Sequence, residues 1–476
     1  MICIPITAKT TAEALRDMQA AAPLADMIEL RLDHIKDADL PLLLAQRPRP
    51  VIVTITPREE NGVFTGTDAE RRALFEQAIA LGAEYIDCNM GWHALPRLQS
   101  IKGATRIIVS SHNYAETPAD LSTLYRDIAA TGADVVKIAA HAGRISDNLR
   151  MLELIRAADR GIIGICMGEK GEVSRILAPA YGALLTFGSL AQGKESAPGQ
   201  IPAEVMRSVY GCERLNRDTR LFGLIGNPVS KSRGYILFNR LFRHYGLNMA
   251  YLNFLVDDVD DFMGSFGRVL GGFSITMPHK QAVAQYLDAR DAISERIGAV
   301  NTMVNLKGRL LGCNTDTAGI VRPLLQRTAL KGKRAALLGA GGAARAAAAA
   351  LMEQDARVTI LNRTVSRAQE IARELGCEAG ALDDFNPAET DVLLNMTSVG
   401  MHPNVDEMPL PAEKLHDVIV FDGVYNPPET LLLRRAAQNG CTVISGLEMF
   451  ISQAAEQFRL WTGIEPDPDL MRKILS

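Results

Sequence analysis

The chain has 476 residues, of which 47% are hydrophobic and 22% are charged, a composition typical of a globular protein. The formal net charge is −4, and no apolar run approaches the roughly 20 residues that span a bilayer. We therefore expect no nucleic-acid partner and no membrane partner. The seven cysteines stand singly, which argues against a metal site and a disulfide framework and predicts a reduced, cytoplasmic protein.

The first two hundred residues alternate short β-rich apolar runs with amphipathic stretches. The runs cover residues 2–7, 27–32, 51–56, 85–88, 106–110, 135–139, 162–166 and 184–187. Strands that alternate with helices indicate a parallel sheet. Eight such units in this length predict a closed (β/α)8 barrel, with an open doubly wound sheet as the alternative.

The carboxyl ends of the predicted barrel strands carry polar and ionisable residues. In such barrels, this end of the strands forms the active site. Glu29 and Arg31 lie on the second run, and Lys137 lies inside the sixth. The other candidates end or follow later runs: Glu60, His112, Met167, Arg175, Ser196 and Gln200.

The remaining chain predicts a two-domain α/β arrangement. A charged stretch at 209–220 is the expected linker after a barrel of residues 1–208. A strand then restarts at Leu221, and Lys307–Gly308 is typical of a hairpin turn. We expect one domain over 221–328 that is completed by a final helix within 446–476, and another over 329–445.

Lys137 is unusual because burying an ammonium group is costly. Desolvation lowers the pKa of a lysine, and a neutral amine forms Schiff bases with ketones. The alternatives are a lysine that points outward, or one paired with a carboxylate such as Glu29. His112, which follows the preceding predicted strand, suits a general base that Glu60 could orient, and Arg175 offers a bidentate site for a carboxylate. These neighbours favour a catalytic, uncharged amine.

Residues 1–205 resemble type I 3-dehydroquinate dehydratase. The resemblance rests on IELRLD, SSHNYAETP, GADVVKIA, GEVSRILA, TFGS and SAPGQI. It implies that Lys137 forms an imine with the substrate ketone. It also implies that His112 removes the acidified proton and later protonates the departing hydroxyl, and that Glu60 positions His112.

The same resemblance implies the substrate contacts. Residues that would hold the hydroxyls and the carboxylate are Glu29, Arg31, Arg175, Ser196 and Gln200, and Met167 would line the pocket. One position departs from the family, since Thr56 stands where an arginine is common. Either Arg58 reaches the same space or the contact is lost.

A glycine-rich turn, GAGGAAR, follows the predicted strand at 335–338 and opens a helix. Gly339, Gly341, Gly342 and Ala343 would place backbone N–H groups and a helix N-terminus against a pyrophosphate.

The residues at the end of the next predicted strand indicate whether the cofactor is NAD or NADP. It carries Asn362, Arg363 and Thr364, followed by Arg367. An NAD site usually has an acid at this point, whereas arginine favours the 2′-phosphate of NADP. We therefore predict NADP. The alternative is a pair of solvated arginines at a helix start.

Lys280 follows a predicted strand in SITMPHK, and Asn301 and Asp316 lie at two polar strand ends. A lysine and an aspartate can transfer a proton beside a carbonyl that is being reduced, although such a pair is more often a surface ion pair.

Residues 221–476 resemble shikimate dehydrogenase through GNPVSKS, SITMPHK, IGAVNT, GCNTDTAG, GAGGAAR, NMTSVGM and FDGVYNPPET. The resemblance implies that Lys280 and Asp316 form the catalytic pair. It implies further substrate contacts from Ser230, Ser232, Thr276, Asn301, Tyr425 and Gln453, and nicotinamide contacts from Thr397 and Gly446. Arg233 and Ala454 depart from the family, where proline and glycine are common.

Together, the two resemblances predict a bifunctional enzyme of the shikimate pathway that acts on 3-dehydroquinate, 3-dehydroshikimate and shikimate. Three alternatives are a reductase with an inactive barrel, a catabolic NAD-dependent quinate or shikimate dehydrogenase, and a non-catalytic binder. Lys137, His112 and Glu60 argue against an inactive barrel, and Arg363 argues against NAD.

Overall fold

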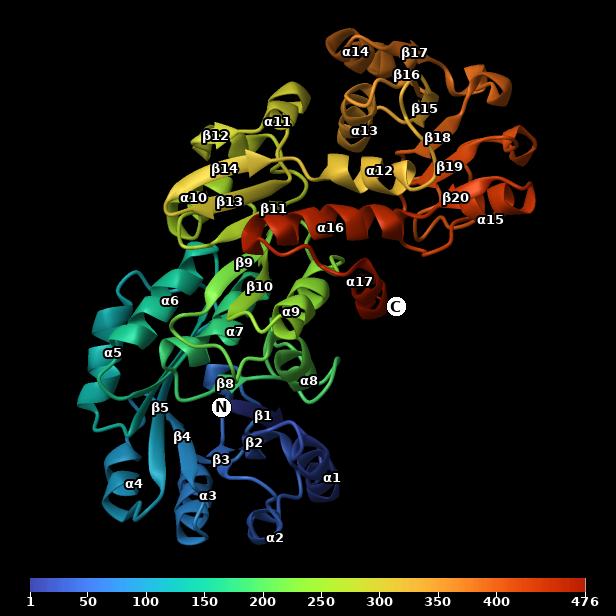
Figure 1. The fold of residues 1–476 in the computed structure, drawn as a ribbon. Helices are drawn as coiled ribbons and strands as arrows, with labels where there is room; N and C mark the ends of the chain where they lie inside the picture. The colour runs from blue at the N-terminus through green and yellow to red at the C-terminus, as the bar shows by residue number, and fades with distance from the viewer. Residues whose placement is uncertain (476) are drawn as a thin grey trace. The chain divides into compact units, whose positions relative to one another are not determined.

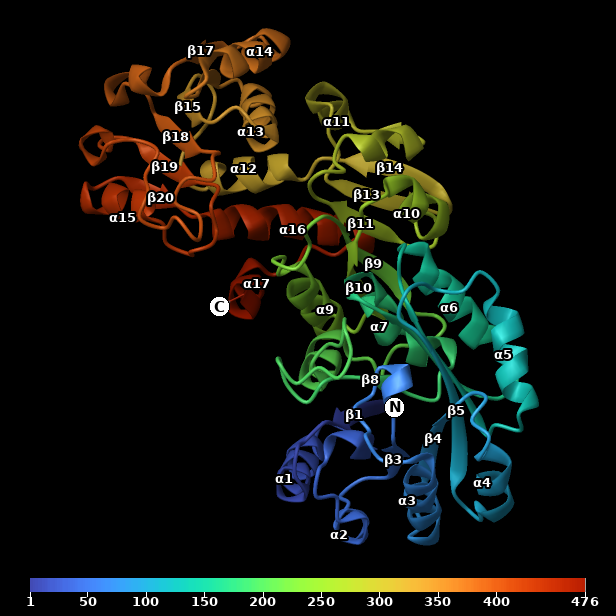
Figure 2. The ribbon, with the colours of Figure 1, turned by 180° about the vertical axis from the view of Figure 1, so that it is seen from behind.

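The computed structural model describes residues 1–475 (Figures 1 and 2). Contacts between residues divide the chain into two compact units, Met1–Leu270 and a second unit that begins at Gly271. Each unit is an α/β structure and is described by itself. Within residues 1–475, no helix combines the length and the apolar character needed to cross a membrane.

The first unit contains an eight-stranded parallel sheet in which each strand pairs with its sequence neighbours. The strands are β1 (Ile2–Ile6), β2 (Met27–Arg31), β3 (Val51–Thr54), β4 (Tyr85–Asn89), β5 (Arg106–Asn113), β6 (Val135–His141), β7 (Gly161–Met167) and β8 (Thr186–Phe187). β1 pairs with both β2 and β8, and the Leu184 N–H donates to the Ile162 carbonyl at 2.8 Å. The sheet is therefore a nearly closed barrel, and every predicted run is a strand.

Helices alternate with the barrel strands, as the sequence predicts (Figure 1). They are α1 (Thr11–Ala21), α2 (Leu40–Ala45), α3 (Asp68–Ala80), α4 (Leu95–Ile101), α5 (Leu121–Ala130), α6 (Ser146–Ala157) and α7 (Glu172–Tyr181). Local sequence fixes where several of them begin. Thr67 and Glu70, for example, form a capping box that satisfies the first free N–H groups of α3.

The first unit continues beyond the barrel. It includes α8 (Ala203–Val205), α9 (Gly234–His244), α10 (Val259–Ser265), β9 (Arg220–Gly226) and β10 (Met249–Leu255). β9 and β10 pair in parallel. Asp261 of α10 accepts hydrogen bonds from the Ser146 backbone N–H at 3.0 Å and from its hydroxyl at 2.7 Å. These bonds join the segment to the start of helix α6, which follows β6.

The second unit begins with strands β11 (Gly272–Ile275), β12 (Ala289–Arg290), β13 (Thr302–Leu306) and β14 (Arg309–Cys313), together with helices α11 (Ala292–Ile297) and α12 (Asp316–Leu325). β13 and β14 are antiparallel. They are joined by the predicted Lys307–Gly308 turn, whose φ angles are 54° and 93°. The C-terminal helices are α16 (Gly446–Thr462) and α17 (Pro468–Leu475). The sequence analysis did not predict α17.

A parallel six-stranded sheet, in the order β17-β16-β15-β18-β19-β20, occupies the rest of this unit. Its strands are β15 (Arg334–Leu338), β16 (Arg357–Leu361), β17 (Glu378–Gly380), β18 (Val392–Asn395), β19 (Ile419–Asp422) and β20 (Thr442–Ile444), and its helices are α13 (Gly342–Met352), α14 (Val365–Leu375) and α15 (Leu431–Gln438). The strand order reverses beside β15, and ligands bind at such a switch point in Rossmann-like sheets. The predicted α/β fold class is confirmed.

Candidate active sites

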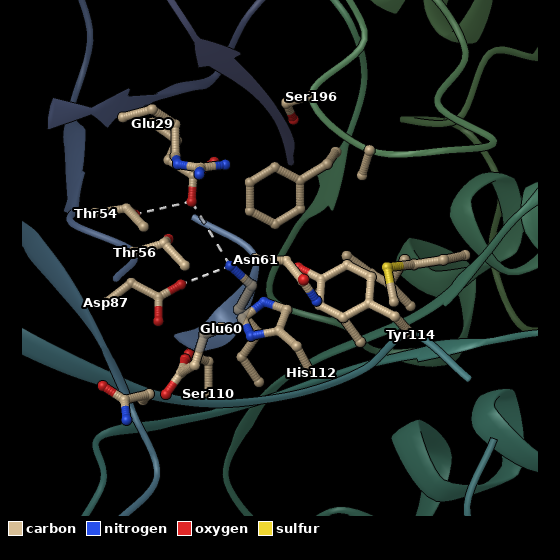
Figure 3. Close-up of a pocket in the computed structure, with 18 of the residues that line it drawn as sticks. Glu29, Thr54, Thr56, Glu60, Asn61, Asp87, Ser110, His112, Tyr114 and Ser196 are labelled. Carbon is tan, nitrogen blue, oxygen red and sulfur yellow. Dashed lines mark hydrogen bonds and ion pairs between the residues drawn. The ribbon is translucent and has the colours of Figure 1, made fainter. Parts of the chain in front are cut away.

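One cavity at the carboxyl ends of the barrel strands contains every residue that the sequence predicted there (Figure 3). Its volume is about 220 Å³. The predicted residues that line it are Glu29, Arg31, Glu60, His112, Lys137, Met167, Arg175, Ser196 and Gln200. The barrel fold therefore gathers side chains from all along the first two hundred residues around a single space.

Lys137 lies on β6 with only 6% of its surface exposed. Its Nζ donates to Asp87 Oδ2 at 2.5 Å and lies 3.6 Å from Glu29 Oε1. Burial alone would lower the pKa of Lys137, but the two carboxylates outweigh burial and raise this pKa above its ordinary value. The expectation of an uncharged amine is therefore wrong: the cavity holds an ammonium group paired with acids.

Lys137 and three side chains around its amine come from alternate strands of the barrel. Glu29 is on β2, Asp87 on β4, Lys137 on β6 and Phe187 on β8, and the amine lies 4.9 Å from the centre of the Phe187 ring. Alternate strands supply each interior layer of such a barrel. Glu29 Oε1 also accepts from the Thr54 hydroxyl at 2.9 Å.

The sequence analysis missed Asp87. It is 3% exposed in the middle of β4, within a run that we recognised only as a strand. A charged residue inside an otherwise apolar strand was the available signal, since carboxylates are rarely buried without a partner.

His112 lies within β5, one residue before its end, and not after the strand as expected. Its ring stacks on Tyr114 with centres 6.2 Å apart, and its Nδ1 is buried without a hydrogen-bond partner among residues 1–475. Burial first, and the Lys137 charge second, lower the pKa of His112 to about 4. At neutral pH the ring is therefore an uncharged base.

Glu60 ends a short 3-10 turn after β3 and lines the same cavity as His112. Burial raises the pKa of Glu60, while the buried guanidinium of Arg71 opposes this rise. His112 Nδ1 has no hydrogen-bond partner among residues 1–475, so Glu60 does not bond to it.

Thr56, which stands where the family commonly has an arginine, lines the cavity, whereas Arg58 is exposed and does not line it. Of the two alternatives for the missing arginine, the structure favours a lost contact.

Arg175 forms the candidate anion site of the cavity. It is 1% exposed, its Nη2 donates to the Pro198 carbonyl at 3.2 Å, and its Nε has no partner in the described chain. Burial lowers the pKa of Arg175 to about 10, so it stays charged at neutral pH. Ser196 and Gln200 bond to each other at 2.8 and 3.0 Å beside it. A buried cation with an unused donor suits a carboxylate.

Arg31 and Met167 complete the predicted lining. Asp33 accepts two hydrogen bonds from the Arg31 guanidinium, at 2.9 and 2.7 Å, and so fixes its orientation. Met167 ends β7 and is 4% exposed.

The second unit holds the predicted lysine–aspartate pair. Lys280 Nζ donates to Asp316 Oδ2 at 2.6 Å, and Asn301 Nδ2 donates to Asp316 Oδ1 at 2.7 Å. Asn301 directly precedes β13 and Asp316 opens α12, so neither lies at a strand end as expected. With side chains 32% and 16% exposed, the pair is more enclosed than a simple surface ion pair.

A hydrogen-bond chain holds Asn301 in place. Its Oδ1 accepts from the Thr302 hydroxyl at 2.7 Å and from the Thr315 N–H at 2.8 Å. Gln457 of α16 donates to the Thr302 hydroxyl at 2.9 Å. The sequence analysis missed Gln457, which gives no signal because it lies within an ordinary amphipathic helix.

The other predicted substrate residues are more widely distributed. In the second unit, the Gln453 amide donates to the Phe450 carbonyl at 3.2 Å, and the Tyr425 ring stacks on the Phe450 ring with centres 5.7 Å apart. Thr276 directly follows β11. Ser230 and Ser232 belong to the first unit, in the loop between β9 and α9. The Ser232 hydroxyl accepts from the Gly234 N–H at 3.2 Å.

The glycine turn after β15 leaves open space in front of α13. Gly339 has a φ of 110°, and a Cβ there would lie 2.9 Å from Thr397 Cγ2, so this position requires glycine. No atom lies within 4 Å of where a Cβ of Gly341 or Gly342 would stand. Ala343 is exposed at the same helix start. This space and the helix N-terminus fit a pyrophosphate.

Arg363 and Arg367 are exposed after β16, and their side chains bond to no other residue that the structure describes. Asn362 donates to the Thr364 carbonyl at 2.9 Å and shapes this turn. Two uncommitted guanidinium groups fit a 2′-phosphate.

Thr397 and Gly446 lie at the carboxyl end of the same sheet. The Thr397 hydroxyl donates to Asn395 Oδ1 at 2.6 Å. A Cβ at Gly446 would lie 2.4 Å from the Val424 carbonyl oxygen, so the start of α16 requires glycine.

Family models match most of the chain. They are the type I 3-dehydroquinase at residues 2–217, the shikimate dehydrogenase substrate-binding domain at 224–303, the shikimate/quinate 5-dehydrogenase at 323–406 and the shikimate 5′-dehydrogenase C-terminal domain at 446–475.

Relatives resemble either the whole chain or its second half. A chloroplastic bifunctional 3-dehydroquinate dehydratase/shikimate dehydrogenase of Arabidopsis thaliana is 39% identical over 100% of this chain and 84% of its own. A shikimate biosynthesis protein of Chlamydia pneumoniae is 30% identical over 97% of this chain and 95% of its own. The crystal structure of Thermus thermophilus shikimate 5-dehydrogenase with NADP(H) and shikimate is 37% identical, covers 54% of this chain and 98% of its own, and has a TM-score of 0.50. The chain therefore belongs to the family of bifunctional 3-dehydroquinate dehydratases/shikimate dehydrogenases.

Proposed function

We propose that the barrel cavity dehydrates 3-dehydroquinate through an imine on Lys137 and that the lysine–aspartate site of the second unit supplies the proton for reduction of 3-dehydroshikimate to shikimate. The chain is a bifunctional shikimate-pathway enzyme, a type I 3-dehydroquinate dehydratase and an NADP-dependent shikimate dehydrogenase. The observation that carries the proposed residue roles is the buried Lys137 beside an uncharged His112 in one cavity.

In the barrel, Arg175, Ser196 and Gln200 hold the substrate carboxylate, so that the ketone faces Lys137. The imine nitrogen carries a positive charge that draws electrons from the adjacent carbon and acidifies its C–H bond. His112 takes that proton as a neutral base and returns it to the departing hydroxyl.

In the second unit, Lys280 donates a proton to the carbonyl oxygen of 3-dehydroshikimate, and Asp316 orients Lys280. Asn301 holds the second oxygen of Asp316, which keeps the pair in one geometry. NADPH, when bound, supplies the hydride. The glycine turn holds its pyrophosphate, and Arg363 and Arg367 hold its 2′-phosphate.

We further propose that the protein works in the cytoplasm on small-molecule substrates, without nucleic acid. The proposed domains are 1–208 for the dehydratase, 221–328 with 446–476 for shikimate binding, and 329–445 for NADP. The starts of the substrate-binding match at 224 and of the C-terminal match at 446 support two of these boundaries, whereas the dehydroquinase match ends at 217 and the shikimate/quinate match covers 323–406.

Covalent trapping tests the imine. Borohydride added with 3-dehydroquinate should attach the reduced substrate to Lys137, as peptide mass spectrometry would show. Lys137→Ala should abolish trapping and lower dehydratase kcat by at least about 10³-fold, while dehydrogenase activity in the same chain remains. Undiminished trapping in Lys137→Ala would remove this assignment.

The titration of His112 tests its role as a neutral base. In protein with ¹³C-labelled histidine, the His112 signal, assigned with His112→Gln, should titrate near pH 4 and not near 6.5. The ring then gains no charge between pH 8 and 5. A midpoint near 6.5 would contradict the proposed protonation state.

Asp316→Asn tests the proton-transferring pair. The amide keeps the size of the side chain but removes the charge that holds Lys280, so the kcat for 3-dehydroshikimate reduction should fall about 10²–10⁴-fold. Dehydration of 3-dehydroquinate should be unchanged. A parallel loss of both activities would show that the dehydratase and dehydrogenase sites do not work independently.

Arg363→Ala tests recognition of the 2′-phosphate. Loss of a charge-assisted bond should lower kcat/KM for NADPH at least about tenfold and leave the value for NADH nearly unchanged. Arg373→Ala, an exposed arginine on helix α14, which begins two residues after Arg363, is the control and should alter neither. Equal losses for both cofactors would show that Arg363 does not recognise the phosphate.

A further inference from the structure

The amine of Lys137 must lose protons before it can form an imine. Its two carboxylate neighbours hold it as an ammonium group in the cavity. An ammonium group has no lone pair with which to attack a carbonyl carbon. A base in contact with Nζ is therefore needed.

We propose that Asp87 is a catalytic base that accepts the protons of Lys137 and delivers them to the departing ketone oxygen. This inference rests on the proposed imine at Lys137. Asp87 Oδ2 lies 2.5 Å from Nζ, within the distance at which a proton can pass directly between the two atoms (Figure 3).

The surroundings of Asp87 suit this role better than those of the other nearby groups. Its bond from Lys137 is the only hydrogen bond that its carboxylate makes within residues 1–475, so protonation of Asp87 breaks no other contact. Glu29 lies farther away, at 3.6 Å, and already accepts from Thr54. His112 makes no hydrogen bond to Nζ and is needed for the later C–H step.

The proton balance closes without another reactant. The ammonium group carries three hydrogens. Asp87 takes the first, the freed lone pair forms the C–N bond, and the carbonyl π pair moves to oxygen, which Asp87 then protonates. Asp87 takes a second hydrogen from the carbinolamine nitrogen and passes it to the hydroxyl. The C–O bond breaks, water leaves, and the iminium retains the third hydrogen while Asp87 returns to a carboxylate.

A purely electrostatic role for Asp87 predicts the opposite sign of effect. If Asp87 only stabilises the ammonium form, Asp87→Asn leaves more neutral amine at neutral pH and speeds imine formation. If Asp87 is the base, the same substitution slows imine formation. The rate of imine formation therefore distinguishes the two roles. A measurement of the protein's overall stability would not distinguish them.

The experiment measures that rate in full-length protein. Enzyme is mixed with 3-dehydroquinate, quenched with borohydride at increasing times near pH 7, and the modified Lys137 is quantified by mass spectrometry. Asp87→Asn should reduce the rate about 10²–10⁴-fold, with dehydrogenase activity retained as the check on folding. An unchanged or faster rate would overturn the proposal.

Asp134→Asn is the matched control. Asp134 accepts from Lys102 Nζ at 2.5 Å just before β6 begins, so the substitution removes an aspartate–lysine pair of similar length outside the cavity. It should leave the trapping rate unchanged, and a fall equal to that of Asp87→Asn would contradict a specific role for Asp87.

A second variant keeps the test decisive if Asp87→Asn does not fold. Asp87→Glu retains a carboxylate and should trap substrate within about tenfold of the wild-type rate; a folded Asp87→Glu protein that traps no substrate would overturn the proposal. Failure of the wild-type protein to trap at Lys137 would instead refute the proposed dehydratase chemistry.

Discussion

The burial of one lysine amine among two carboxylates is the constraint on which the barrel site depends. A cation that is removed from water needs compensation, and alternate strands supply it because Glu29, Asp87 and Lys137 come from β2, β4 and β6. The ammonium and the iminium carry the same charge, so this surrounding suits the lysine before and after it reacts. The acids therefore stabilise the cationic forms of the lysine, and the amine must give up protons before it can attack.

The same cation has a second effect, on the base. Its positive charge and the burial of the ring keep His112 unprotonated at neutral pH. The proposed nucleophile and the proposed base thus differ in protonation state in one cavity because their neighbours differ: Lys137 contacts acids, whereas His112 Nδ1 contacts no hydrogen-bonding group of the described chain.

The lysine of the second unit works in another environment. Lys280 is partly exposed and contacts one carboxylate, whose other oxygen is fixed by Asn301. This arrangement suits repeated proton donation more than covalent attack, since the amine stays near solvent beside a single fixed carboxylate. The proposed cofactor region follows a different principle, since open space beside backbone glycines and uncommitted arginines would provide the binding site.

Sequence patterns alone determined the strands, the barrel and the residues that line its cavity, because strand periodicity is local and the motifs of both families are present. They also predict that Arg363 distinguishes the two cofactors. Only the tertiary structure decided the charge of Lys137 and the presence of Asp87 beside it. These two residues are 50 positions apart in the chain, and a pKa depends on charges brought near in space, which no local pattern records.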